Sequence, residues 1–199
     1  MKTISHHVVL TIIRTWLPLA FGLTVLIGLV YGAVQQTYRQ SANDPQIQLA
    51  EDIANALAAG NVKPTDLVST EKTDMATSLA SFLIVVDKDN KVLASNVKLH
   101  TAEPAVPAGV YAQARAEKQN RVTWQPEAGV RSAIVAQAVP GSSGQVVLIG
   151  RSLRETENRI NQLSIMTIGA WVIAVFGSLI INVLATVLRP KEAPPVVTQ

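Results

Sequence analysis

The residues that could bind a metal ion in this chain are few and poorly spaced for the task. His6 and His7 are adjacent, His100 stands alone in a polar segment, and the chain contains no cysteine. A metal site needs several ligands that point to one centre from one face, normally with acidic side chains nearby. We therefore expect solvated or interfacial histidines and no metal site, and the absence of cysteine also excludes disulfides and thiolate chemistry.

Two carboxylates, Asp87 and Asp89, lie close together in the segment DKDN. They could begin a calcium-binding loop, but such a loop needs more oxygen ligands than this segment offers. A hairpin turn is the favoured interpretation, because Asp and Asn are common turn residues. The sequence also lacks the GxSxG, HExxH, P-loop and GxGxxG motifs, and no nucleophile has a suitably spaced base. We therefore expect neither an enzyme nor a bound cofactor.

Four residues are candidates for ligand binding. Tyr111 and Trp124 would provide an aromatic platform and Arg131 a cation in an otherwise aliphatic region, with Gln137 as a weaker fourth candidate. A few polar groups in apolar surroundings are typical of small-molecule pockets. The alternative is that Tyr111 and Trp124 belong to the core and that Arg131 lies on the surface.

The charge of the chain is concentrated at its ends. The 199 residues carry a net charge of +3, yet residues 35–163 contain 13 basic and 13 acidic side chains. The excess comes from the ends, which carry the basic residues Lys2, Arg14, Arg189 and Lys191 and one acidic residue, Glu192. A nucleic-acid-binding domain normally shows a basic patch on its folded surface. The distribution thus argues against a nucleic-acid partner and suggests a membrane protein.

Two uncharged runs are long enough to cross a bilayer. Residues 15–34 form a run of 20 and residues 164–188 a run of 25. The basic residues flank both runs on the same side, so the positive-inside rule places 1–14 and 189–199 in the cytoplasm. Residues 35–163 would then form an extracytoplasmic domain, anchored in the cytoplasmic (inner) membrane of the cell.

A cleaved signal peptide is the alternative for the first run. Residues 15–34 are longer than a typical signal-peptide core, and an Ala-x-Ala cleavage site is missing because Tyr31 stands two residues before Ala33. An uncleaved anchor is therefore the favoured interpretation.

Gly28 and Gly32 are spaced as a small-xxx-small motif within the first run. Such pairs let helices approach closely in a membrane, within one chain or between chains. The same spacing also arises by chance in apolar segments, so a packing role is one of two interpretations.

The central region predicts an α+β domain. Asp44 and Pro45 are typical of a helix start, and Gly60 of a helix end. Runs rich in β-branched residues and alternating patterns predict a hairpin followed by an antiparallel meander, which together form a five-stranded sheet with packed helices. The predicted helices are 44–59, 107–119 and one from Ser152; the predicted strands are 81–86, 91–95, 120–125, 130–139 and 145–150.

Two segments carry a resemblance to a known family: SFLIVVDKDNKVLASN (81–96) and RSAIVAQAVPGSSGQVVLIGRSLRETENRINQL (131–163). They resemble the PAS-like or single-Cache extracytoplasmic sensor domains of bacterial two-span receptors, such as sensor histidine kinases and chemoreceptors. In those proteins a hairpin opens the sheet, and a last strand, here ending at Gly-Arg-Ser-Leu, leads into a signalling helix. The resemblance implies a ligand held between the sheet and its covering helix, here 107–119.

The chain departs from that family after its second apolar run. Eleven residues, 189–199, stand where such receptors continue into an output module. We therefore expect either a fragment or, as the favoured interpretation, a sensor subunit that passes a ligand or envelope signal through its two spans to a separate membrane signalling protein. The alternative is a non-enzymatic accessory or scaffolding subunit of a transporter or envelope complex. Either protein could form a homodimer.

Overall fold

The computed structural model describes residues 6–41 and 44–188. The chain divides into two compact units, which we describe separately. One unit is Gln36–Ile160, called the sheet domain below. The other joins the residues up to Gln35 with those from Asn161 onward and is called the helix pair. The expected tail 189–199 lies outside the described residues.

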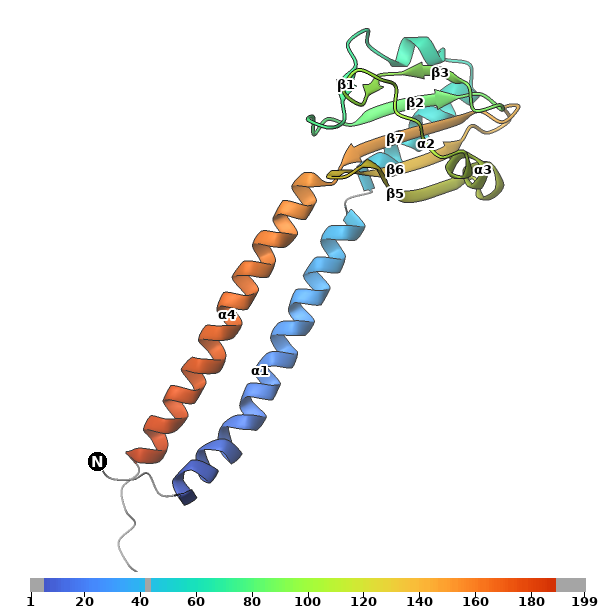
Figure 1. Ribbon diagram of the computed structural model, residues 1–199. Helices are drawn as coiled ribbons and strands as arrows, with labels where there is room; N and C mark the ends of the chain where they lie inside the picture. The colour runs from blue at the N-terminus through green and yellow to red at the C-terminus, as the bar shows by residue number, and fades with distance from the viewer. Residues whose placement is uncertain (1–5, 42–43, 189–199) are drawn as a thin grey trace, which may run out of the picture. The chain divides into compact units, whose positions relative to one another are not determined.

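A five-stranded antiparallel sheet forms the centre of the sheet domain (Figure 1). The strand order is β3-β2-β7-β6-β5, so the first hairpin joins the final meander through β2 and β7. The α+β class, the hairpin and the meander predicted from sequence are confirmed. The strands are β2 (Phe82–Val86), β3 (Val92–Ser95), β5 (Gln119–Glu127), β6 (Val130–Ala138) and β7 (Val146–Ser152).

Both faces of this sheet are covered. β2 is buried along its whole length, which explains why it reads as an unbroken apolar run. Because successive side chains of a strand point to opposite faces, alternate residues enter two separate cores. We call the two sides the α3 face and the α2 face, after the helices that pack on them.

The α3 face is covered by α3 (Ala108–Glu117), which buries Tyr111 and Ala114 against the sheet. A small parallel sheet of β1 (Thr73–Asp74) and β4 (Val97–Lys98) lies beside this core and contributes Val97. The sequence did not predict these two short strands, which stand in segments that read as polar loops.

The α2 face is covered by α2 (Asp44–Ala58), where Ala50 and Ala54 are buried against β6 and β7. The helix begins at the predicted residue and ends one residue early. Gly60 follows it with a positive φ of 71°, a conformation that glycine adopts without steric cost. A 3₁₀ turn, η1 (Pro64–Leu67), then adds Leu67 to the same core.

The predicted turn between β2 and β3 is confirmed. The Asp87 carboxylate accepts hydrogen bonds from the main-chain N–H groups of Asp89 and Lys91, both at 2.9 Å. Asn90 adopts a φ of 63°, which Asn tolerates better than most residues. This geometry is that of an Asx turn, in which the Asp side chain accepts a hydrogen bond from the main chain two residues later.

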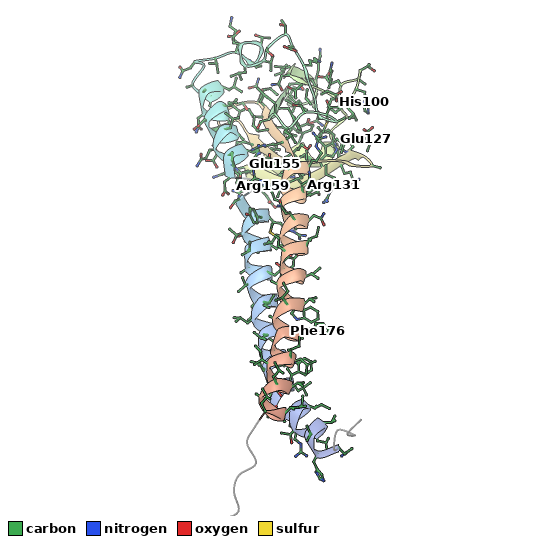
Figure 2. The ribbon with its side chains drawn as sticks, turned by 90° about the vertical axis from the view of Figure 1, so that its left-hand side faces the viewer. His100, Glu127, Arg131, Glu155, Arg159 and Phe176 are labelled. Carbon is green, nitrogen blue, oxygen red and sulfur yellow. The ribbon has the colours of Figure 1, made fainter. Side chains whose placement is uncertain are left out.

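The helix pair consists of parts of α1 (His6–Ser41) and α4 (Arg154–Val187). Both helices are long and apolar enough to cross a membrane, and only 6% of the most apolar window in each is buried. A core helix of a water-soluble protein would be mostly buried instead. Figure 2 shows Phe176, for example, pointing away from the two helices.

Hydrogen bonds join α1 and α4 at four levels within the helix pair. Thr15 meets Asn182 through contacts of 2.9 and 3.1 Å between side chains. At the second level, Trp16 Nε1 donates to the Ser178 hydroxyl (3.1 Å) and to the Val175 carbonyl (3.2 Å). At the third level, Trp171 Nε1 donates to the Thr24 hydroxyl (2.9 Å). At the fourth level, the hydroxyls of Tyr31 and Ser164 lie 2.7 Å apart. Residue numbers rise along α1 as those of their partners on α4 fall, so the two helices are antiparallel.

Candidate functional site

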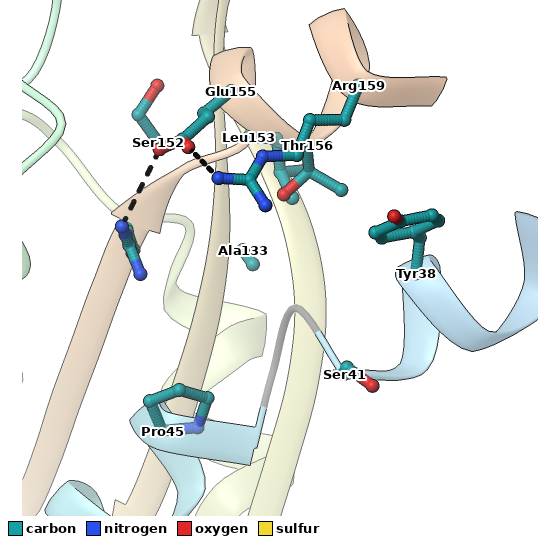
Figure 3. A pocket seen from close by; sticks show the side chains of 10 residues that line it. Tyr38, Ser41, Pro45, Ala133, Ser152, Leu153, Glu155, Thr156 and Arg159 are labelled. Atoms are coloured by element: carbon teal, nitrogen blue, oxygen red, sulfur yellow. Dashed lines mark hydrogen bonds and ion pairs between the residues drawn. The ribbon is translucent and has the colours of Figure 1, made fainter. Parts of the chain in front are cut away.

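A cavity of about 290 Å³ opens on the α2 face of the sheet domain (Figure 3). Its floor includes Ala133 of β6, and its wall includes the end of β7 and the first residues of α4. We call it the arginine cavity. Its lining residues are Tyr38, Ser41, Pro45, Ala133, Arg151, Ser152, Leu153, Glu155, Thr156 and Arg159.

Two helices begin at this cavity. Pro45 is the second residue of α2, and Leu153 to Thr156 surround the start of α4. The Ser152 hydroxyl accepts a hydrogen bond from the Arg154 N–H at 3.3 Å and so closes the turn that starts α4. The first N–H groups of a helix carry a partial positive charge, so both starts favour an anion nearby.

Three charged side chains of α4 and β7 meet in the cavity. The Glu155 carboxylate lies 3.9 Å from an Arg151 nitrogen and forms a second ion pair with Arg159 (Figure 3). With two guanidinium groups and one carboxylate, the lining has an excess of one positive charge. Each of the three side chains is at least 40% exposed, so these pairs are weak and open to exchange.

Further contacts hold the start of α4 to the rest of the sheet domain. Arg131 on β6 pairs with Glu157, and Arg154 donates hydrogen bonds to the carbonyls of Ala76 and Thr77. The side chains that make these contacts are largely exposed, and no described residue of α4 belongs to either core, so the first turns of α4 depend on exposed polar contacts. A ligand that competes for them can therefore change how α4 is held.

Tyr111 and Trp124 lie in the core of the α3 face, with exposed fractions of 4% and 7%. Burial raises the pKa of the Tyr111 phenol to about 12, although the charge of Arg115 opposes the shift. Their side chains fill the space between sheet and helix in which the resemblance expects a ligand. This placement matches the alternative interpretation, that both aromatic residues belong to the core.

Arg131 and Gln137 lie on the opposite face of the sheet. Trp124 pairs with Ser132 in the register of β5 and β6, so the even-numbered residues of β6 point to the α3 face and the odd-numbered ones to the α2 face. Gln137 there accepts a hydrogen bond from Gln119 at 2.8 Å. The four candidate residues therefore do not form one site.

Gly28 and Gly32 are not used in the contact between α1 and α4. A Cβ atom placed on either glycine would meet nothing within 4 Å. Within the described chain, the two helices meet instead through polar side chains. The face that carries Gly28 and Gly32 is therefore open within the described residues.

The histidines of the described residues have partners other than a metal. His100 Nε2 lies 3.0 Å from a Glu127 carboxylate oxygen (Figure 2). The main-chain N–H of His100 donates a hydrogen bond to the Asp74 carboxylate. His6 and His7 lie edge to face. Among the residues that the structure describes, no three His, Asp or Glu side chains are grouped so that they could hold a metal ion.

The arginine cavity was not predicted from the sequence, although the spacing of its charged residues gives one signal. Arg151, Glu155 and Arg159 follow one another at intervals of four, a spacing that would place them on one face of a helix, although Arg151 belongs to β7 in the structure. In the structure Glu155 binds arginines, and its part in a cavity depends on α2, which lies a hundred residues away in sequence.

A comparison with models of protein families finds no family that matches this chain, and a comparison with curated proteins finds no match.

Proposed function

We propose that this chain is a membrane-anchored sensor or signal-input protein. Its two apolar helices would cross the cytoplasmic membrane with both chain ends in the cytoplasm, and the sheet domain would lie outside as a PAS-like or Cache-like input domain. A ligand or envelope signal would change the start of α4, and the change would pass along that helix to a separate membrane signalling partner.

The observation that carries the proposal is the position of the arginine cavity. Its wall contains Arg151, Glu155 and Arg159, and α4 continues from there as a single helix to Val187. A ligand shifts a conformational equilibrium only if it binds the two states with different affinity. Competition for the Glu155 carboxylate or its arginines supplies such a difference at the first turns of α4.

The membrane topology is supported by charge and exposure. The basic residues at the two chain ends flank the apolar runs on one side, and the sheet domain carries balanced charge. The apolar surface of α1 and α4 is exposed along most of its length, which suits lipid and not water.

A labelling experiment tests the topology, and the absence of natural cysteines makes it direct. Thr70 is exposed in the sheet domain, and His7 is exposed at the start of α1. A membrane-impermeant maleimide should label Thr70→Cys in intact cells. It should label His7→Cys only after the cells are permeabilised. Equal labelling of both in intact cells contradicts the proposed topology.

A cross-linking experiment tests whether the cavity communicates with the helix pair. Cysteines at Thr15 and Asn182, whose side chains touch, should form a disulfide across α1 and α4. Replacing Glu155 with Gln in that background should change the disulfide rate several-fold, whereas Glu117→Gln on α3 should not. An unchanged rate in both variants contradicts signal passage along α4.

An accessory or scaffolding subunit is the second candidate. It is favoured by the open glycine face at Gly28 and Gly32, which leaves room for a helix of another protein in the membrane. Purification in mild detergent distinguishes the two. This candidate is favoured if the chain is recovered in a stable complex with transporter or envelope proteins and Gly28→Leu disrupts that complex. Recovery of the chain as a lone monomer eliminates it.

A further inference from the structure

We propose that the arginine cavity binds the phosphate head group of an anionic phospholipid. The inference rests on the proposed function in one respect, that the apolar part of α4 lies in a membrane. It adds the chemical class of the ligand and its source, the bilayer in which the chain is anchored.

The charge of the cavity fits a singly charged anion. Arg151 and Arg159 share a single carboxylate, Glu155, which leaves one guanidinium charge unbalanced. A phosphodiester carries one negative charge, and arginine nitrogens match the oxygens of a phosphate in pairs. Since the arginine pairs are exposed, a phosphate can exchange with the carboxylate without breaking a buried contact.

Neutral donors complete the chemistry. Hydroxyl groups of Tyr38, Ser41, Ser152 and Thr156 line the cavity, and α2 and α4 both begin there. Hydroxyls and helix N-termini are the groups that proteins commonly offer to phosphate oxygens, beside arginine. Two helix starts and two arginines therefore give one cavity four sources of positive potential, opposed by Glu155 within the lining.

The position of the cavity along the chain selects a lipid over a soluble phosphate. Arg159 precedes the apolar run at Ser164 by five residues, about 7.5 Å along a helix that rises ~1.5 Å per residue. Tyr38 follows Val34, the end of the first apolar run, by four residues, about 6 Å. Each head-group layer of a bilayer is about 5–7.5 Å thick. Along the chain, Arg159 and Tyr38 thus stand within about one head-group layer of the two apolar runs.

The size of the cavity is consistent with a head group alone. Its volume of about 290 Å³ is near the lower end of ligand pockets, which begin at about 300 Å³. A whole phospholipid does not fit. The acyl chains would stay in the bilayer while the phosphate and its substituent enter the cavity.

Native mass spectrometry of the full chain released from nanodiscs tests the inference. The wild-type chain, released from nanodiscs that contain phosphatidylcholine and phosphatidylglycerol, should retain more phosphatidylglycerol than phosphatidylcholine. The double variant Arg151→Gln/Arg159→Gln should lose that preference. The matched control Lys91→Gln/Arg121→Gln removes the same charge from exposed positions outside the cavity and should keep it.

A second variant gives a gain rather than a loss, which misfolding cannot imitate. Glu155→Gln removes the carboxylate that competes for the arginines, so retention of phosphatidylglycerol should rise above wild type. Equal retention in wild type and in the Arg151→Gln/Arg159→Gln variant overturns the inference. A thermal-shift measurement on the detergent-solubilised chain gives a second outcome that overturns the inference. If inorganic phosphate raises the melting temperature as much as phosphatidylglycerol does, the cavity binds a soluble phosphate.

Failure of this inference is separable from failure of the proposed function. If the chain does not enter nanodiscs, the membrane-anchored function falls and the lipid site falls with it. If the chain enters nanodiscs but shows no preference for phosphatidylglycerol, the lipid site alone is overturned and the sensor proposal stands on its own tests.

Discussion

The sheet domain and the helix pair use similar apolar residues in opposite ways. In the sheet domain, Ile134 and Leu148 are fully buried between layers. In the described part of the helix pair, Ala20 and Val175 are the buried residues, and large side chains such as Ile173 are exposed. Side-chain hydrogen bonds join the two helices at four levels, whereas the layers of the sheet domain meet mainly through apolar contacts.

The difference is the one expected of a domain in water and a helix pair in lipid, the environments proposed above. In water, burial of apolar surface provides most of the driving force for folding. In lipid that force disappears between helices, because the surrounding acyl chains are as apolar as leucine, and polar contacts and close packing take its place. Hydrogen bonds such as that between Thr15 and Asn182 would therefore specify the pairing of α1 with α4. Four substitutions test this contrast.

The largest effect is expected from Ile134→Ala. Removal of a fully buried side chain leaves a cavity and should lower the free energy of unfolding of the sheet domain by about 2–5 kcal/mol. Urea denaturation of the full chain in detergent, followed by circular dichroism, measures it. The same truncation at Ile173, which is 75% exposed, should change it by less than about 0.5 kcal/mol. Equal losses would erase the contrast between the two regions.

Gly150→Ala should have the next largest effect. A Cβ atom at this position would overlap ring carbons of Phe82, which is 1% exposed, and overpacking of this kind costs about 1–3 kcal/mol. Phe82→Leu in the same chain should recover part of the loss, which a double-mutant cycle detects. Gly169 in the helix pair has open space, so Gly169→Ala should be harmless. A loss at Gly169 equal to that at Gly150 argues against the packing described.

A smaller effect is expected when a polar contact of the helix pair is removed. Asn182→Leu loses the hydrogen bonds to Thr15 and should weaken the pairing of α1 and α4 by about 0.6 kcal/mol, the average for such contacts in membranes, and by at most about 1.7 kcal/mol. Denaturation of the chain in micelles, followed by fluorescence of Trp16 and Trp171, reports on it. Ile181→Leu, at an exposed neighbouring position, is the control. No difference between the two variants would mean that the hydrogen bond does not stabilise the pair.

The smallest effect concerns Asp74, on the surface of the sheet domain. The N–H of Ala76, followed by the N–H and charge of His100, holds the pKa of this carboxyl below its ordinary value. A lowered pKa stabilises the fold above the pKa of the unfolded chain, and this contribution disappears as pH falls through the folded value. The difference in urea midpoint between wild type and Asp74→Ala should thus narrow from pH 7 to pH 3. A constant difference would assign the effect to packing.

Much of the fold was predictable because its signals are local. β-branched runs and alternation located the five strands, and Asp44, Pro45 and Gly60 located α2, since capping and turn chemistry act within a few residues. The pair β1 and β4 escaped prediction because two-residue strands leave no periodic signal. Arg131 and Gln137 were grouped with Trp124 by residue type, although the strand register places them on the other face.

By itself, the sequence determined the α+β class, the balanced charge of the sheet domain and the two apolar runs, since each depends on composition or short-range pattern. The tertiary structure alone decided which residues share a cavity and which contacts join the helices. Arg151 and Arg159 meet Tyr38 and Pro45 only because the strands pair and α2 packs on one face of the sheet. Those are long-range packing events, and no local pattern in the chain encodes them.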